Sequence, residues 1–172
     1  MQAVPNYTIR PFQPADQTFL YEMLYQAIFI PEGHEPPPHA VVYEPDLRKY
    51  VEDFGQPPGD LAYIAVDGAT QQPIGAVWLR LLTGDHKGYG YVDEQTPELS
   101  IAIAPGHRGQ GIGHALLAQL LATAQAQYRA ISLSVWFENP AFRLYQRLGF
   151  QVVTEDGPAV TMVKRFRPNE AP

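Results

Sequence analysis

The segment from Pro105 to Gly113 combines residue types that bind anions. It reads Pro-Gly-His-Arg-Gly-Gln-Gly-Ile-Gly and lies between an apolar, strand-like segment and a helix-like one. Because glycine has no Cβ, its backbone N–H groups approach a ligand closely, and the first N–H groups of a helix have no partner within it. Arg108 adds a permanent positive charge. We therefore expect this segment to bind a phosphate or pyrophosphate.

Two common nucleotide-binding motifs do not fit this segment. The phosphate-binding loop of nucleotide hydrolases requires a lysine and then a serine or threonine after its last glycine, and neither follows Gly113. The dinucleotide fingerprint requires another glycine spacing and an acidic residue about 20 positions further on, where residues 127–130 contain none. A glycine-rich turn without a ligand remains the alternative.

The other chemistry-bearing residues do not form a recognisable site. The chain contains no cysteine, which excludes disulfides, thiolate catalysis and zinc–thiolate sites. His34, Glu35 and His39 lie in a proline-rich stretch and not on one helix face, so we expect no metal site. His86 and His107 lie in expected loops, where histidines are usually surface residues.

The anion-binding segment also fits the pattern Arg/Gln-x-x-Gly-x-Gly/Ala, through Arg108, Gly111 and Gly113. In this it resembles the acetyl-CoA-binding motif of the GNAT superfamily of N-acetyltransferases. The resemblance is specific over residues 98–165, looser before them, and implies an acetyl-CoA-dependent N-acetyltransferase that uses no metal. Three further stretches resemble that family in the same order: Glu-Leu-Ser-Ile-Ala-Ile-Ala-Pro at 98–105, Asn-Pro-Ala-Phe-Arg-Leu-Tyr-Gln-Arg-Leu-Gly-Phe at 139–150, and Val-Thr-Met-Val-Lys-Arg at 160–165.

The resemblance implies a place for each part of coenzyme A. The pyrophosphate would lie on the backbone amides of residues 108–113, and pantetheine would pair with the main chain of the preceding strand at Ile101 and Ile103. Asn139 would reach the cofactor; its alternative role is to cap the following helix. The implied cofactor-binding residues are Ile101, Ala102, Ile103, Arg108, Gly109, Gln110, Gly111, Ile112, Gly113, Asn139 and Tyr145.

The same resemblance implies two catalytic residues. Tyr145 matches the family tyrosine near the thioester sulfur and would protonate the leaving thiolate; alternatively, it is an aromatic residue on the inner face of its helix. Glu98 is placed like the glutamate that relatives use as a base, often through a water; alternatively, it is a solvated carboxylate at a strand end. Burial would raise the Glu98 pKa toward the working range. The amine would attack directly in a ternary complex, with the carbonyl polarised by a backbone N–H near Ile101 to Ile103.

The hydrophobic pattern predicts the elements that position these residues. The order of the elements and the resemblance together predict one α/β (α+β) domain over residues 1–172. Its central sheet is expected to be mixed and mostly antiparallel, with about seven strands, helices on both faces, and strands 98–104 and 131–136 parallel. We expect strands at 7–10, 61–66, 74–82, 98–104, 131–136, 152–153 and 160–164, and helices at 17–29, 46–54, 113–129 and 139–148.

Charge and composition narrow the partners. The formal net charge of −6 argues against nucleic-acid binding. Residues 1–98 hold fourteen acidic and five basic residues, whereas residues 99–172 hold four and seven, so the two halves either face ligands of opposite charge or carry scattered solvated side chains. The sequence has neither a recognisable signal peptide nor a membrane-length apolar run, so we expect a cytoplasmic protein.

The expected acceptor is a small cationic amine or a peptide amino group. In the family that the chain resembles, specificity comes from the first helices and the loops over the cofactor, here residues 18–54 and 83–97. Acidic and aromatic side chains suit an ammonium group through charge steering and cation–π contact. The alternatives are a non-catalytic acyl-CoA-binding or sensor domain and transfer of another acyl group; exposed aromatic residues also permit a homodimer. These two segments carry Glu32, Glu35, Glu44, Asp46, Asp85, Asp93 and Glu94, with Tyr21, Tyr25, Phe29, Tyr43, Tyr89 and Tyr91.

Overall fold

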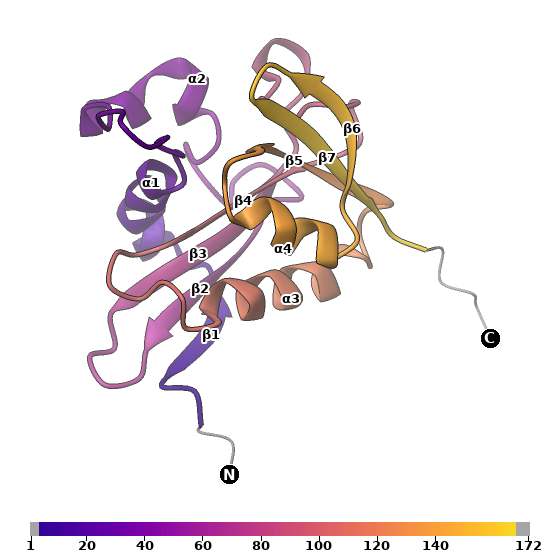
Figure 1. Ribbon diagram of the computed structural model, residues 1–172. Helices are drawn as coiled ribbons and strands as arrows, with labels where there is room; N and C mark the ends of the chain where they lie inside the picture. The colour runs from indigo at the N-terminus through magenta and orange to yellow at the C-terminus, as the bar shows by residue number, and fades with distance from the viewer. Residues whose placement is uncertain (1–3, 168–172) are drawn as a thin grey trace, which may run out of the picture.

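A single seven-stranded sheet runs through the molecule (Figure 1). The computed structural model describes residues 4–167. The strands lie in the order β1-β2-β3-β4-β5-β7-β6, and every neighbouring pair is antiparallel except β4 and β5. This confirms the expected mixed, mostly antiparallel sheet and its one parallel pair. The strands are β1 (Tyr7–Pro11), β2 (Leu61–Asp67), β3 (Pro73–Arg80), β4 (Glu98–Ile103), β5 (Ala130–Trp136), β6 (Gln151–Asp156) and β7 (Ala159–Arg165).

Helices cover both faces of the sheet (Figure 1). Because successive side chains of a strand point to opposite faces, each strand contributes to two separate cores. On β3, Leu79 packs in the core beneath α3 and α4, whereas Trp78 packs in the core beneath α1 and the segment that follows α2. The helices are α1 (Gln17–Gln26), α2 (Pro45–Arg48), α3 (Ile112–Ala124) and α4 (Ala141–Arg147), and short 3-10 turns lie at Pro14–Asp16, His39–Tyr43 and Gly84–His86.

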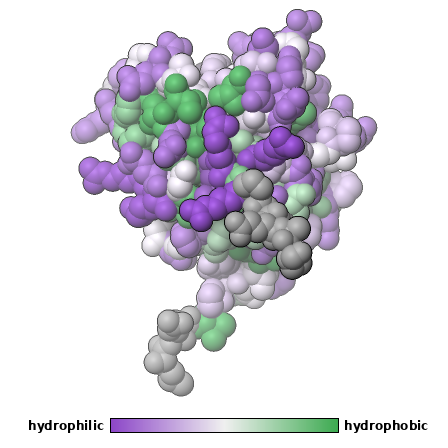
Figure 2. Space-filling model, turned by 90° about the vertical axis from the view of Figure 1, so that its right-hand side faces the viewer, coloured by the Kyte–Doolittle hydropathy of each residue, from purple (hydrophilic) through white to green (hydrophobic). Residues whose placement is uncertain are grey.

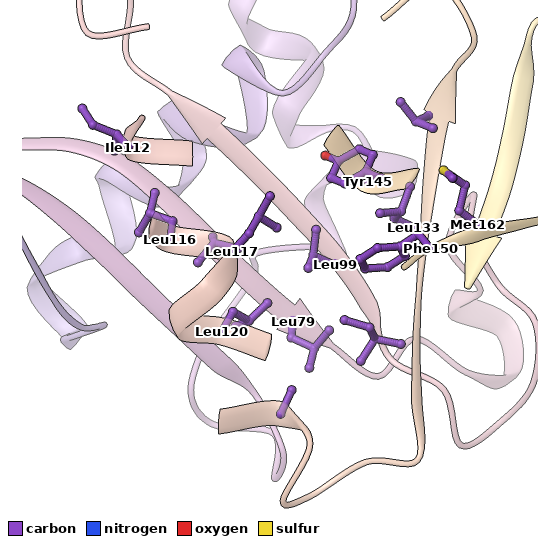
Figure 3. Close-up of a cluster of buried hydrophobic side chains, with 14 of the residues drawn as sticks. Leu79, Leu99, Ile112, Leu116, Leu117, Leu120, Leu133, Tyr145, Phe150 and Met162 are labelled. Carbon is purple, nitrogen blue, oxygen red and sulfur yellow. The ribbon is translucent and has the colours of Figure 1, made fainter. Parts of the chain in front are cut away.

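The core beneath α3 and α4 contains Tyr145, one of the two residues that the sequence suggests as catalytic. Figure 3 shows the leucines of α3 directed at the sheet, with Tyr145 of α4 in the same cluster. Leu116, Leu117 and Leu120 are completely buried, and Leu99 of β4 lies between them and α4. The helix expected after the glycine-rich turn therefore packs on the sheet through these leucines.

All four expected helices are shorter than the sequence pattern indicates, and the helix expected at 139–148 spans only Ala141–Arg147. The expected helix 17–29 ends at Gln26, and the expected helix 113–129 ends at Ala124. The largest error concerns residues 46–54: α2 ends at Arg48, and turns continue to residue 55. Part of the reason lies outside the segment, in side chains that bond its backbone.

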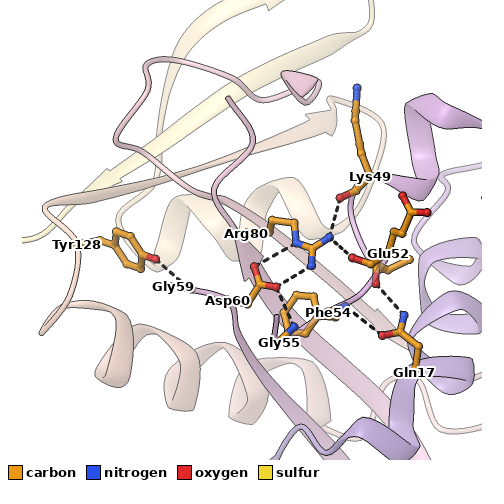
Figure 4. Close-up of polar contacts among 10 residues, drawn as sticks. Gln17, Lys49, Glu52, Phe54, Gly55, Gly59, Asp60, Arg80 and Tyr128 are labelled. Carbon is orange, nitrogen blue, oxygen red and sulfur yellow. Dashed lines mark hydrogen bonds and ion pairs between the residues drawn. The ribbon is translucent and has the colours of Figure 1, made fainter. Parts of the chain in front are cut away.

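Arg80 at the end of β3 fixes that segment on the sheet (Figure 4). Its guanidinium donates to both carboxylate oxygens of Asp60, at 3.1 and 2.6 Å, and to the carbonyls of Lys49 and Glu52, at 3.0 and 2.7 Å. Both side chains of the ion pair are buried. Arg80 thus bonds the backbone of a stretch that continues as turns, in which Asp53 has a positive φ of 49°.

The parallel pair β4–β5 opens along its length. Its ladder contains one residue pair, Glu98 with Ser132, next to a hydrogen bond from the Ser132 N–H to the carbonyl of Pro97 at 3.0 Å. On its other side β4 pairs with β3 from Glu98 to Ile103. One edge of β4 is therefore left without a strand partner beyond Glu98.

None of the helices within residues 4–167 has the length and apolar character needed to cross a membrane.

Figure 2 shows the side of the molecule on the right of Figure 1, where purple side chains dominate and green ones gather in small groups. The edge strand β6 is exposed along its whole length, including Val152 and Val153. The homodimer that the sequence permits stays a prediction.

Candidate active site

A cleft of about 720 Å³ occupies the opening between β4 and β5. Its lining comes from both faces of the sheet: residues 25–30 and 36–37 from the side of α1, and Leu117 and residues 139–141, 144 and 145 from the side of α3 and α4. A second hollow of about 590 Å³ lies over the glycine-rich turn before α3. Because both contain Ile103, Arg108, Gly113 and Leu144, they adjoin and form one site with two parts, called here the apolar part and the turn part.

The free edge of β4 can pair with an extended ligand. The Ala104 N–H donates to the carbonyl of Ile74 at 2.8 Å, on the side of β3. Backbone polar groups alternate along a strand, so those of Ile101 and Ile103 face the opening, whereas those of Ala102 face β3. The Ile103 carbonyl accepts a hydrogen bond from Arg108 at 3.2 Å. The side chains of Ile101 and Ile103 pack on the buried core and also line the cleft.

The glycine-rich turn presents its backbone to the turn part of the site. Gly109 and Gly111 have φ of +74° and +81°, which residues with a side chain rarely adopt. A Cβ on either would meet no protein atom within 4 Å, so the space in front of the turn is open. Gly111 caps α3, and the first bond of that helix runs from Ala115 to the Gly111 carbonyl. The preceding N–H groups point out of the helix end, where an anion is stabilised.

Arginine and histidine side chains line this turn. Arg108 lines both parts of the site and also donates to the Gln26 side chain at 3.1 Å, which joins the turn to the end of α1. His107 and His114 line the turn part from the loop and from α3, and Arg147 lines it from the last turn of α4. His114 and Arg147 were not expected from the sequence. The only available signal for Arg147 was its position in the stretch 139–150 that carries the family resemblance.

Tyr145 closes the apolar part from the side of α4. Its side chain is 7% exposed, and its ring packs edge-on against Phe150 with the centroids 5.7 Å apart. Figure 3 shows the hydroxyl pointing away from Phe150. Burial raises the pKa of the Tyr145 phenol, so its hydroxyl holds its proton at neutral pH. The protonated hydroxyl can therefore donate a hydrogen bond into the cleft.

Asn139 lies at the start of α4 and lines the apolar part. Its side-chain oxygen accepts a hydrogen bond from the Ala141 N–H at 3.0 Å, which is the helix-capping contact expected as its alternative role. Its side-chain amide can still donate. Cofactor contact by Asn139 therefore stays a prediction beside a structural role.

Glu98 lies under a loop and does not line the cleft. Its carboxylate accepts from the Gly90 N–H at 2.7 Å and from the Tyr50 hydroxyl at 3.1 Å, and the same hydroxyl accepts from the Tyr89 N–H at 2.7 Å. Glu98 is 3% exposed, and its Oε2 has no partner. Burial raises the pKa of Glu98, because it outweighs the hydrogen bonds from Gly90 and Tyr50 that lower it.

Two glycines allow the loop to lie this close to Glu98. A Cβ on Gly88 would overlap the Glu98 carboxylate. A Cβ on Gly90 would lie 2.7 Å from the carbonyl carbon of Leu133 and 2.9 Å from the nitrogen of Ser134, and Ser134 lines the cleft. The loop thus fills the narrow end of the β4–β5 opening. It separates Glu98 from solvent and borders the cleft at Ser134.

This geometry agrees with the comparison of the sequence with known families. Residues 19–150 match the Acetyltransferase (GNAT) family. The chain belongs to this family. The match covers more than half of the chain and includes β4, the glycine-rich turn, α3 and α4.

Solved GNAT structures share the fold over almost the whole chain. The PaiA N-acetyltransferase from Thermoplasma acidophilum, in complex with coenzyme A, is 20% identical, with 94% of this chain and 100% of that chain covered and a TM-score of 0.66. The ribosomal-protein-S18-alanine N-acetyltransferase from Escherichia coli is 19% identical, with 96% and 98% covered and a TM-score of 0.62. A chimera of the spermidine N-acetyltransferase SpeG from Vibrio cholerae and hSSAT is 22% identical, with 94% and 96% covered and a TM-score of 0.58. No curated protein matches the sequence.

The GNAT site gathers most of the residues expected from the sequence. Ile101, Ile103, Arg108, Asn139 and Tyr145 line the apolar part. Glycines 109, 111 and 113, with Ile112, line the turn part. Gln110 lies in the same turn but bonds back to the Gly106 carbonyl at 3.4 Å. The tyrosine that holds Glu98, Tyr50, was missed, since it precedes Glu98 by 48 positions and no local pattern joins them.

The acidic residues that the sequence suggests for substrate binding lie outside both parts of the site. Within the described residues, no aspartate or glutamate lines either part. The acidic residues expected around the substrate are exposed and lie outside the lining, and Asp93 and Glu94 accept bonds from their own loop. Within residues 4–167 no three potential metal ligands cluster; His39 instead stacks on Tyr25, with the ring centroids 3.8 Å apart.

Proposed function

We propose that this GNAT protein is an N-acetyltransferase that moves an acetyl group from acetyl-CoA to a primary amine. The observation that carries the proposal is the opening between β4 and β5. It has an anion-binding turn at one end and a buried tyrosine hydroxyl beside its apolar part. Acetyl-CoA supplies the acetyl group as a thioester. Its charged pyrophosphate matches the turn part of the site, and its uncharged pantetheine matches the apolar part.

The proposed binding mode uses groups that have few partners within the protein. The backbone amides of residues 109–113 would hold the pyrophosphate, with Arg108 and Arg147 as nearby cations. The free edge of β4 at Ile101 and Ile103 would pair with the pantetheine amides. The cofactor would therefore lie along β4 with its thioester toward Tyr145.

The proposed chemistry is direct attack of the amine on the thioester carbonyl. The new carbon–nitrogen bond forms as the carbon–sulfur bond breaks, and a backbone N–H on the free edge of β4 polarises the carbonyl oxygen. Tyr145 gives its proton to the leaving thiolate. Glu98 takes the proton of the ammonium group through a water before the attack, because the loop at Gly90 separates its carboxylate from the cleft. The second proton that the nitrogen loses on forming the amide returns the Tyr145 phenolate to the phenol.

The proposed acceptor is a small cationic amine or a peptide amino group. Exposed acidic side chains in residues 32–46 and 83–94 would attract an ammonium group toward the site. Similar solved structures include enzymes named for spermidine and for the alanine of a ribosomal protein, so the fold accommodates both kinds of acceptor.

Acetyl transfer across a panel of amines and peptides tests the proposal. The purified protein is incubated with acetyl-CoA and each acceptor, free CoA is measured, and the acetylated product is identified by mass spectrometry. Release of CoA that depends on an amine supports the proposal. Tight acetyl-CoA binding without turnover of any amine would favour the alternative of an acyl-CoA sensor. Faster transfer from a longer acyl-CoA would change the donor but keep the reaction.

A further inference from the structure

The apolar part of the cleft has one mouth that the proposed cofactor leaves free. The glycine-rich turn and Tyr145 belong to the face of the sheet covered by α3 and α4, so the cofactor approaches from that face. Eight further lining residues come from the opposite face, from the end of α1 and the proline-rich loop. If the proposed function holds, these residues contact the acceptor. They are residues 25–30 with Pro36 and Pro37.

The aromatic residues of this mouth are held in place. The Tyr25 hydroxyl donates to the carbonyl of Pro37 at 2.7 Å, and its ring stacks on His39. Phe29 reaches Trp136 at the end of β5, with the ring centroids 5.8 Å apart. The Gln26 side chain donates to Glu22 at 2.9 Å and accepts from Arg108 at 3.1 Å. Because the polar groups of Tyr25 and Gln26 already have these partners, the mouth presents mainly ring and aliphatic surface.

The absence of a lining acid limits how many positive charges an acceptor can bring. The reacting amine must lose its proton before it attacks, so it needs no lasting anionic partner. A second ammonium group stays charged, and a charge taken from water without a paired carboxylate is strongly unfavourable. Within the described residues the cleft lining offers no such carboxylate. Glu98 is buried and directly precedes Leu99, which lines the cleft. Its carboxylate already accepts two hydrogen bonds beneath the loop that contains Gly90.

We infer that the acceptor is a primary amine with a single positive charge and an apolar or aromatic body beside its amino group. This inference rests on the proposed function and narrows it. The exposed acidic residues attract the ammonium group from solvent, and the mouth then receives the uncharged body. Short di- and polyamines are poorer acceptors because of their second charge.

A matched pair of amines tests the inference. Hexylamine and 1,5-diaminopentane have the same number of non-hydrogen atoms, but the second ends in an ammonium group where the first ends in a methyl group. We expect kcat/KM for hexylamine to exceed that for 1,5-diaminopentane at least about ten-fold, and 2-phenylethylamine to be accepted as well. Equal or faster turnover of 1,5-diaminopentane or spermidine overturns the inference and leaves the proposed function standing. Turnover of no amine overturns both.

Two variants test whether the residues of this mouth contact the acceptor. Phe29→Ala should raise KM for 2-phenylethylamine about ten-fold and leave the Kd of coenzyme A unchanged, because Phe29 lies on the face away from the turn. Tyr43→Ala is the control, since Tyr43 is an exposed aromatic residue of the same region and lies outside the lining. An unchanged KM in Phe29→Ala, or an equal increase in Tyr43→Ala, contradicts the assignment.

Discussion

The buried ion pair between Arg80 and Asp60 supports the segment that holds Glu98, and its removal has a predictable cost. Arg80→Met removes four donated hydrogen bonds and leaves the Asp60 carboxylate buried, with its side chain 2% exposed. Removing one partner of a buried ion pair costs about 3–5 kcal/mol, a large part of the roughly 5–15 kcal/mol that stabilises a domain. We expect the free energy of unfolding in urea to fall by about 3–5 kcal/mol, followed by the fluorescence of the buried Trp78.

Two control variants show whether the stability loss comes from breaking a buried ion pair or only from the loss of an arginine side chain. Arg48→Met removes an exposed ion pair with Glu52, 3.3 Å long, and should cost less than about 0.5 kcal/mol. The double variant Arg80→Met with Asp60→Leu removes both buried charges and should recover part of the loss. A loss below about 1 kcal/mol in Arg80→Met, or no recovery in the double variant, would refute the reasoning.

Three further predictions concern catalysis. Tyr145→Phe should lower kcat about 100-fold and leave the Kd of acetyl-CoA unchanged, measured by steady-state kinetics and calorimetry. Because burial raises the Glu98 pKa, kcat/KM should rise with pH through a midpoint above the ordinary value of about 4.3, and Glu98→Gln should abolish this rise. Tyr50→Phe removes a hydrogen bond that favours the charged carboxylate, so it should move the midpoint to higher pH. Full turnover in Tyr145→Phe, or an unmoved midpoint in Tyr50→Phe, would contradict these assignments.

The parts of the fold that local patterns determine were predictable from the sequence. The glycine-rich turn before α3 and the alternating strand β4 depend on neighbouring residues, and both lie where expected. The helix expected at 46–54 ends at Arg48, and distant side chains bond the backbone that follows. Arg80 bonds two of its carbonyls, and Gln17 bonds the Val51 carbonyl and the Phe54 N–H.

The site was predictable to a similar extent, and for the same reason. The cofactor strand and the turn lie next to each other in the sequence, so their joint role is visible in one motif. The enclosure of Glu98 depends on Tyr50 and Gly90, which approach from two other segments. The lack of acidic residues in the cleft was also hidden, because the sequence shows that residues 18–54 are acidic but not where their side chains point.

The most direct test of the account is calorimetric titration of coenzyme A into Gly111→Ala, with Gly33→Ala as the matched control. Gly33 has nearly the same φ, +82° against +81°, and a Cβ on either glycine meets no protein atom within 4 Å. Both variants should therefore lose about 1–2 kcal/mol of stability from backbone strain. The Cβ at Gly111 stands in the space proposed for the pyrophosphate, so only this variant should bind coenzyme A at least about ten-fold more weakly. Equal affinity in Gly111→Ala and the wild type would contradict the account.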